Sequence, residues 1–294
     1  MIWLIGNKGM LGTELSILLE KSGMEFIGTD KETDITNPIS LRSFASSKPI
    51  KWIINCAAYT AVDKAENDEY SCRLLNTTGA ANVAAVACAI GAILIHISTD
   101  YVFDGNANQP YTEDHPSSPI GVYGVTKRDG EINVLQENPS SYIIRTAWLY
   151  GMYGNNFVLT MLRLLNENDQ ISVVDDQRGS PTWSYDLSSA ILMIIRTGEN
   201  NKNIPFGIYN YTNEGNITWY DFAKEIYFRA QEIGYITKDC LLKSCDSNEY
   251  PSIVKRPAYS VLNKAKIKKA LGIYIPLWNE SLQNFLHSYS NNQA

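Results

Sequence analysis

The sequence lacks the features that mark several classes of protein. It has no long run of basic residues, and its formal net charge of −6 argues against a nucleic-acid-binding surface. It has no Cys-x-x-Cys motif, and no histidine lies near Cys240 or Cys245, so we predict no metal site. The number of cysteines, five, is odd, which together with the missing motif fits a reducing compartment. We therefore predict a cytoplasmic protein with no nucleic-acid partner.

Long hydrophobic runs are also missing. The mostly apolar stretch at residues 83–97 is shorter than the roughly 20 residues that a membrane span needs, and Gly91 divides it. The apolar run at residues 2–5 meets Gly6 too soon to be the core of a secretory signal. We therefore predict no membrane partner.

What the sequence does have is the composition of a globular protein, with 45% apolar and 19% charged residues. Apolar strand-like runs alternate with helical patterns over residues 1–150. This alternation predicts an α/β fold with a Rossmann-type, doubly wound parallel sheet. Residues 151–294 change in character, and we predict that they form mainly a smaller α/β substrate-binding domain. Segments near residues 184–212 are expected to pack back on the first domain.

A glycine-rich turn follows the first predicted strand. Its sequence is Gly6-Asn7-Lys8-Gly9-Met10-Leu11-Gly12, and a helical pattern continues to Gly23. Glycines in this context let the backbone approach a pyrophosphate, which the helix N-terminus then holds. The spacing is Gly-x-x-Gly-x-x-Gly, whereas Gly-x-Gly-x-x-Gly is commoner. We predict a dinucleotide-binding turn.

The end of the second predicted strand, residues 24–29, indicates which dinucleotide binds. Asp30 can accept hydrogen bonds from the adenosine ribose hydroxyls and repels a 2′-phosphate, which slightly favours NADH. Lys31 beside it leaves NADPH open. An adenine ring could rest near Asp34 and Ile35, although Asp34 could equally cap a helix. Small residues after the third strand, including Ala57 and Ala58, let a cofactor lie close to the backbone.

Three side chains predict chemistry between a carbonyl and an alcohol. Thr99 ends an apolar run that reads as a buried strand, and open α/β sheets place their sites at such carboxyl ends. Tyr123 and Lys127 are four residues apart, so on a helix they share one face. An ammonium near a phenol lowers the phenol's pKa, while burial raises it, and a tuned phenol can transfer a proton to a carbonyl oxygen. The alternative is an exposed pair of no functional consequence.

Longer motifs carry a resemblance to a known family. They are the glycine turn, residues 55–66, Ser98-Thr99-Asp100-Tyr101-Val102-Phe103, Tyr123-x-x-x-Lys127, residues 145–150, residues 176–182 and Arg256-Pro257. Together they resemble the extended short-chain dehydrogenase/reductase superfamily and, more narrowly, the dTDP-4-dehydrorhamnose reductase family, over nearly the whole chain. The resemblance implies reduction of the C4 ketone of dTDP-4-dehydro-L-rhamnose with NAD(P)H.

The resemblance also implies roles for individual residues. Tyr123 would give a proton to the ketone oxygen, Lys127 would bind the nicotinamide ribose and lower the pKa of Tyr123, and Thr99 would bond the reacting oxygen. The implied substrate contacts are Thr99, Asp100, Tyr101, Trp148, Arg178 and Arg256. The implied cofactor contacts are Gly6, Gly9, Met10, Leu11, Gly12, Asp30, Asp34, Ile35, Ala57, Ala58, Thr60, Tyr123 and Lys127. Trp148 could instead be a core residue, and each arginine a surface ion pair.

Two departures from related patterns are informative. Dehydratase relatives have Thr-Asp-Glu where this chain has Tyr101 in third place, which disfavours dehydration. Some reductases of the family dimerise through a magnesium ion held by glutamates. Glu14 fits one such position, but Tyr185 and Ser288 stand at the likely counterparts of the others. We therefore expect a monomer or a metal-independent homodimer.

Other functions remain open on the sequence alone. The chain could be a reductase or epimerase of a different nucleotide 4-keto sugar. It could also be a non-catalytic regulatory subunit similar to the β subunit of methionine adenosyltransferase, a role that requires no catalytic pair.

Overall fold

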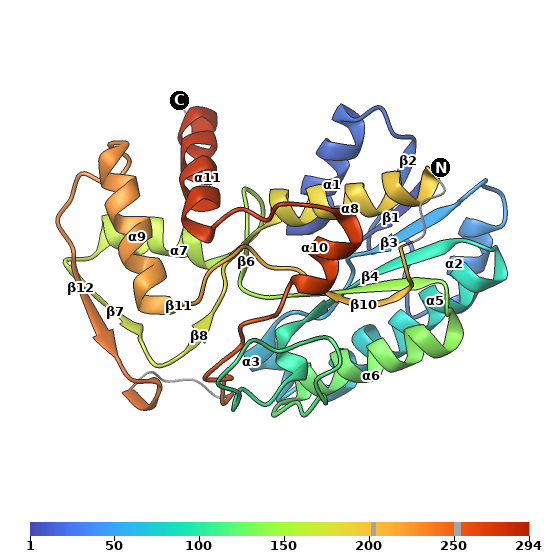
Figure 1. The fold of residues 1–294 in the computed structure, drawn as a ribbon, viewed down its shortest axis with the longest axis horizontal. Coiled ribbons are helices and arrows are strands. Elements are labelled where there is room, and N and C mark those ends of the chain that lie inside the picture. The colour runs from blue at the N-terminus through green and yellow to red at the C-terminus, as the bar shows by residue number, and fades with distance from the viewer. Residues whose placement is uncertain (201–203, 250–253, 294) are drawn as a thin grey trace.

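A computed structural model describes residues 1–200, 204–249 and 254–293. Two lobes lie side by side in Figure 1, one built on a large sheet and the other on helices with short strand pairs. The predicted loop at residues 251–257 falls partly outside the described residues, because residues 251–253 are not among them.

The larger lobe is built on a parallel sheet of six strands in the order β10-β5-β4-β3-β1-β2. The strands are β1 (Ile2–Ile5), β2 (Phe26–Thr29), β3 (Trp52–Asn55), β4 (Ile93–Thr99), β5 (Ser141–Thr146) and β10 (Gly207–Asn210). Strands buried on both faces read as nearly continuous apolar runs, which is how β1 and β3 look in the sequence. The parallel sheet confirms the predicted fold class.

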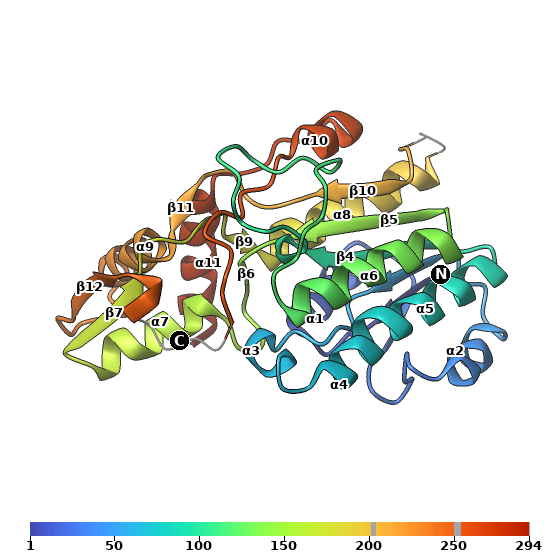
Figure 2. The ribbon, with the colours of Figure 1, turned by 90° about the horizontal axis from the view of Figure 1, so that it is seen from below.

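Helices cover both faces of this sheet (Figures 1 and 2). One face carries α1 (Met10–Lys21), α8 (Ser184–Glu199) and α10 (Ala265–Leu271). The other carries α2 (Pro38–Ala45), α5 (Ala80–Ala89) and α6 (Val122–Glu137). Short elements complete the lobe: α3 (Val62–Ala65), α4 (Glu69–Arg73), a π-helix (Leu74–Gly79) that runs into α5, and a 3-10 turn (Asp100–Val102) after β4.

The smaller lobe packs around its own apolar core, in which Phe222, Phe285 and Leu162 are buried. Its helices are α7 (Phe157–Glu167), α9 (Trp219–Glu232) and α11 (Trp278–Gln293). Its strand pairs are β7 (Gln170–Val174) with β12 (Leu241–Cys245), β8 (Arg178–Gly179) with β11 (Ile217–Thr218), and β6 (Leu149–Tyr150) with β9 (Thr182–Trp183). A 3-10 turn (Ser247–Glu249) follows β12.

The separate cores support the proposed division into two domains near residue 150, which stays a proposal. The chain returns to the first lobe after the boundary, since α8 packs against α1 and β10 pairs with β5. This is the return expected of residues 184–212. The reason is hydrophobic, because the apolar side of α8, including Leu187, Ile191 and Ile195, joins the core under the sheet.

Candidate active site

The candidate site lies where the central strands end. Gly6 follows β1, Cys56 follows β3 and Thr99 ends β4, so these positions meet at the carboxyl edge of the sheet. In the strand order, β3 and β2 lie on opposite sides of β1. Such a point of divergence is where open α/β sheets bind their ligands.

A groove of about 450 Å³ runs along this edge. Its lining contains seven of the predicted cofactor residues: Gly6, Gly9, Asp30, Asp34, Ile35, Ala57 and Ala58. It also contains residues that were not predicted: Ile5, Lys31, Thr33, Cys56 and Leu75. Six predicted cofactor residues are outside the lining: Met10, Leu11, Gly12, Thr60, Tyr123 and Lys127. Leu11 is only 6% exposed and its side chain belongs to the core, so only its backbone is placed to serve a cofactor.

The glycine turn explains why this groove exists. A Cβ on Gly12 would come within 2.1 Å of the Gly6 carbonyl oxygen, and Gly6 itself has φ of +77° and lies against the backbone of Ala57. Gly9 precedes α1, and no side chain caps the first turn of that helix. The N–H groups at that end are therefore open to a diphosphate. The turn fits a dinucleotide, as predicted.

Asp34 does not cap a helix. Its carboxylate accepts hydrogen bonds from the backbone and the hydroxyl of Thr36, at 2.8 and 2.9 Å. The cap of α2 is Asn37, whose side chain accepts from the backbone of Ile39 and Ser40. The alternative reading of Asp34 as a cap is wrong, and its place in the groove lining leaves it available to a cofactor.

The Tyr123 and Lys127 pair lies on α6, at its start, and both side chains are buried. Tyr123 is 9% exposed and Lys127 is 2% exposed, so the alternative of an exposed pair is wrong. The Lys127 ammonium donates a hydrogen bond of 2.6 Å to the carbonyl of Ile97, on the neighbouring strand β4. The pair is therefore held against the strand that carries Thr99.

Burial controls the electrostatics of this pair. It raises the pKa of Tyr123, an effect that a hydrogen bond with Thr99 partly offsets and the nearby Asp100 increases. Burial also lowers the pKa of Lys127 to about 8, against the opposing influence of Glu131. Lys127 is not among the groups that shift the Tyr123 pKa, so the lowering expected from its charge is not seen, and the net shift is upward. The phenol stays protonated at neutral pH, which is the form that a proton donor needs.

Thr99 connects Tyr123 to a second buried acid. Its hydroxyl donates to the Asp100 carboxylate at 3.0 Å and accepts from the backbone N–H of Tyr101 at 3.2 Å. Burial raises the pKa of Asp100 to about 6, against the lowering effect of the Ser260 and Thr99 side chains, and among the described residues its Oδ2 atom has no partner in good hydrogen-bond geometry. Burial likewise raises the pKa of Tyr101 to about 12, and its ring meets that of Tyr123 edge to face at 5.5 Å.

Residues that the sequence did not reveal hold the start of α6 in place. Asn76, in the π-helix, accepts from the backbone of Tyr59 at 2.8 Å and donates to its carbonyl at 3.0 Å, which fixes the loop after β3. It also donates to the hydroxyl of Thr126, which in turn donates to the Tyr123 carbonyl. An asparagine inside an Ala-rich helical pattern was the available signal, because a buried amide there needs partners.

Trp148 is held in a strained position. It has φ of +48°, in the left-handed region that residues with a side chain rarely adopt. Its ring stacks on Trp219 at 3.5 Å between centroids, and a Cβ on Gly179 would lie 2.4 to 2.7 Å from three adjacent indole atoms. The near-equal distances to the outer two of these atoms place Gly179 over the ring, opposite Trp219. Neither face of the Trp148 indole is therefore free in this structure, and only its edge is open. The indole would have to move before a substrate could stack on it.

The side chains of the two predicted arginines contact protein groups. The exposed Arg178 reaches the side-chain oxygen of Asn216 at 3.5 Å. Arg256 forms an ion pair of 3.1 Å with Asp63, the alternative that the sequence left open. Arg256 also lowers the pKa of Tyr101 through its charge, so it lies within electrostatic reach of the site.

The position expected of a family metal ligand is occupied by a buried acid. Glu14 is 8% exposed, burial raises its pKa, and it accepts a hydrogen bond of 3.3 Å from Ser184. Within residues 1–200, 204–249 and 254–293, no three or more His, Cys, Asp or Glu side chains come together as metal ligands. In the same residues, no helix is both long and apolar enough to cross a membrane.

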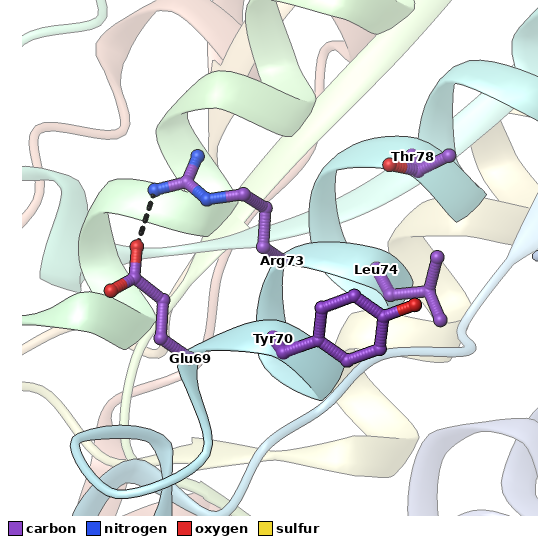
Figure 3. A pocket seen from close by; sticks show the side chains of 5 residues that line it. All are labelled: Glu69, Tyr70, Arg73, Leu74 and Thr78. Atoms are coloured by element: carbon purple, nitrogen blue, oxygen red, sulfur yellow. Dashed lines mark hydrogen bonds and ion pairs between the residues drawn. The ribbon is translucent and has the colours of Figure 1, made fainter.

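A second depression, of about 390 Å³, lies on the outer side of α4 and the π-helix (Figure 3). It is lined by Glu69, Tyr70, Arg73, Leu74 and Thr78. None of the predicted site residues lines this depression. The Arg73 guanidinium there already forms ion pairs with Glu69 and Asp129, each at 2.9 Å. The groove at the sheet edge therefore remains the candidate active site.

Comparison with known proteins shows which family the chain resembles. A family model described as "RmlD substrate binding domain" matches residues 1–291. The chain is 40% identical to a dTDP-4-dehydrorhamnose reductase of Aggregatibacter actinomycetemcomitans over 281 residues, which cover 95% of this chain and 96% of that protein.

Solved structures of the same kind of protein are also similar. A dTDP-4-dehydrorhamnose reductase from Clostridium acetobutylicum superimposes with a TM-score of 0.91 at 40% identity, covering 98% of this chain and 99% of the other. One from Bacillus anthracis, solved in complex with NADP, has a TM-score of 0.91 at 36% identity and 98% coverage of both chains.

Proposed function

The chain belongs to the RmlD substrate binding domain family, and on this premise we propose that it reduces the C4 ketone of dTDP-4-dehydro-L-rhamnose with NAD(P)H. The product is dTDP-L-rhamnose, so the reaction would be the last step of its synthesis. The observation that carries the proposal is the buried set of Thr99, Tyr123 and Lys127 beside a groove that fits a dinucleotide. Relatives named for this reaction support it.

The reaction needs a hydride and a proton. The reduced nicotinamide supplies the hydride to C4 when it is bound. Tyr123 then donates its phenolic proton to the ketone oxygen, because burial keeps this phenol protonated. Thr99 bonds the same oxygen and orients it. Lys127, with a pKa of about 8, is mostly charged at neutral pH and stabilises the phenolate that remains.

The remaining predicted residues would hold the cofactor and the sugar nucleotide. The N-terminus of α1 would bind the cofactor diphosphate, and Asp30 the adenosine ribose. Asp100 has a buried oxygen without a partner in good hydrogen-bond geometry among the described residues, which suits a sugar hydroxyl. Arg178 and Arg256 would exchange their present partners for the substrate diphosphate, to which a guanidinium can donate two hydrogen bonds.

Oxidation of NADH and NADPH by the purified chain, in the presence of dTDP-4-dehydro-L-rhamnose, tests the proposal. We expect Tyr123→Phe to lower kcat by about 10²- to 10⁴-fold, the usual contribution of a positioned acid. Tyr70→Phe is the matched control, since its ring is 78% exposed and should leave kcat unchanged. Full activity of Tyr123→Phe would exclude the assigned proton donor.

The nearest competing function is reduction of a different 4-keto sugar. It is favoured by a relative from Streptomyces antibioticus, 41% identical over 266 residues, named as a probable dTDP-4,6-dihydroxy-2-methyloxan-3-one 4-ketoreductase. The same assay with a panel of 4-keto nucleotide sugars separates the two functions, and NMR of the product detects an epimerase. A purely regulatory subunit would show no turnover with any of them.

We also propose the cellular setting and the assembly. All five cysteines are free thiols, which fits the reducing cytoplasm. We propose a monomer or a homodimer that needs no metal. Light scattering with and without magnesium tests this assembly, and a magnesium-dependent change in mass would contradict it.

A further inference from the structure

At the adenosine end of the groove, side chains tie the glycine turn to the turn after β2. Asp30 and Lys31 line the groove there. Lys8, on the glycine turn, has its Nζ atom 3.5 Å from Oε2 of Glu32. The other oxygen of Glu32 accepts a hydrogen bond of 2.9 Å from the backbone N–H of Asp30. Glu32 therefore contacts both the backbone of the residue expected to bind the ribose and the cation of the glycine turn.

The Glu32 carboxyl group is ionised in this position. Backbone hydrogen bonds from Asp30 and from Glu32 itself lower its pKa, and the Lys8 charge adds to the effect. The two side chains of the pair are 66% and 54% exposed, so either can rotate without unpacking the fold. The pair is a weak, mobile contact at the rim of the groove rather than a structural bond.

A 2′-phosphate at this end would bring close to two negative charges and would need a cation. The lysines nearest to this end of the groove in the sequence are Lys8, on the glycine turn, and Lys31, after β2. Because Lys8 is engaged with Glu32, a phosphate has to compete with a carboxylate for the same ammonium. NADH makes no such demand, since its ribose hydroxyls can donate to Asp30 while the pair stays closed.

We propose that Glu32 sets the preference of the groove between NADH and NADPH by engaging Lys8. With the pair closed, the site favours NADH. NADPH binds when the Lys8 side chain turns from Glu32 to the 2′-phosphate. The Glu32 carboxylate then loses its cation and stays close to the negatively charged phosphate. This deepens the proposed function and rests on it only in requiring that the groove holds a dinucleotide.

Binding of each dinucleotide to the full chain, without sugar substrate, provides the test. Titration followed by the fluorescence of the reduced nicotinamide gives the ratio of the Kd values for NADPH and NADH. Glu32→Gln keeps an oxygen for the Asp30 N–H and removes the charge, so we expect NADPH to gain about fivefold relative to NADH, the effect of one exposed ion pair. Lys8→Met should shift the ratio about fivefold the other way.

Glu25→Gln is the matched control. Glu25 is also an exposed acid, but it precedes β2 at the opposite end of the strand. Five residues of strand separate it from Asp30 by roughly 16 Å, beyond the screening length of about 8 Å at physiological salt. Its removal should leave the ratio unchanged, although it changes the net charge by the same amount.

The double variant Glu32→Gln/Lys8→Met shows whether the effects of the two residues on the ratio of the Kd values for NADPH and NADH depend on each other. Coupled residues should give a Lys8→Met effect that is larger once Glu32 is neutral. Equal effects of Lys8→Met in both backgrounds, or a ratio unmoved by Glu32→Gln while both dinucleotides bind, would overturn this inference alone. Failure of the unaltered chain to bind either dinucleotide would overturn the proposed function as well.

Discussion

The two halves of the candidate site are built in different ways. On the sheet side, Thr99, Tyr123 and Lys127 are buried, and their polar groups are held by neighbouring strands and by Asp100. On the side of the smaller lobe, Arg178 and Arg256 are at least partly open to solvent and bind protein groups that a ligand could replace. Leaving a buried polar group unpaired costs free energy, so the polar groups of Thr99, Tyr123 and Lys127 are paired without a ligand, whereas exposed groups can bind water instead.

The largest expected effect compares one ion pair from each half. Glu131, on α6, and Arg145, on β5, form a 2.7 Å pair, each with a side chain 3% exposed. Glu131→Gln leaves the Arg145 charge buried without an anion, so the free energy of unfolding should fall by about 3–5 kcal/mol. Urea denaturation measures the loss.

Arg163 and Glu167, on α7 in the smaller lobe, are the matched control. Their pair has the same 2.7 Å separation but the side chains are 58% and 55% exposed. Glu167→Gln should cost less than about 1 kcal/mol. Equal losses in the two variants would show that burial does not distinguish the halves.

The charge state of Lys127 should give the next largest effect. Its folded pKa of about 8 lies below the ordinary value of 10.5, so above pH 8 the unfolded chain binds more protons at this residue than the folded chain does. Stability therefore rises with pH between about 8 and 10, by roughly 2 kcal/mol from this residue. Urea denaturation of the unaltered chain and of Lys127→Met, each at about pH 8 and pH 10, isolates the contribution of Lys127 to this rise in stability. A constant difference between them would contradict the assigned pKa.

The smallest effect should separate substrate binding from cofactor binding. Gly179→Ala places a Cβ 2.4 Å from the Trp148 indole, which must then leave its stack on Trp219. If this indole positions the sugar, KM for the nucleotide sugar should rise by about tenfold, equivalent to about 1.4 kcal/mol. Kd for NADH should stay the same, since Trp148 does not line the cofactor groove. A parallel loss of NADH affinity would mean that the two halves are not independent.

The sheet side was predictable because its signals are local. A glycine turn after a strand, an acid at the end of the next strand and a Tyr-x-x-x-Lys pair on a helix all lie within short segments. Gly6, Asp30 and Ala57 line one groove, and their role in binding a cofactor stays a prediction. The sequence did not reveal that burial, and not Lys127, would set the pKa of Tyr123, since burial depends on the elements packed around that residue.

The amino-acid sequence alone determined the parallel α/β fold, the position of the glycine turn after the first strand and the placement of Tyr123 and Lys127 on one helix, because each follows from periodicity and spacing within short segments of chain. Only the tertiary structure decided the placement of Trp148 between Gly179 and Trp219, the pairing of Arg256 with Asp63 and the grip of Asn76 on Tyr59. These contacts join residues 17 to 193 positions apart in the chain, and no local pattern encodes such a meeting.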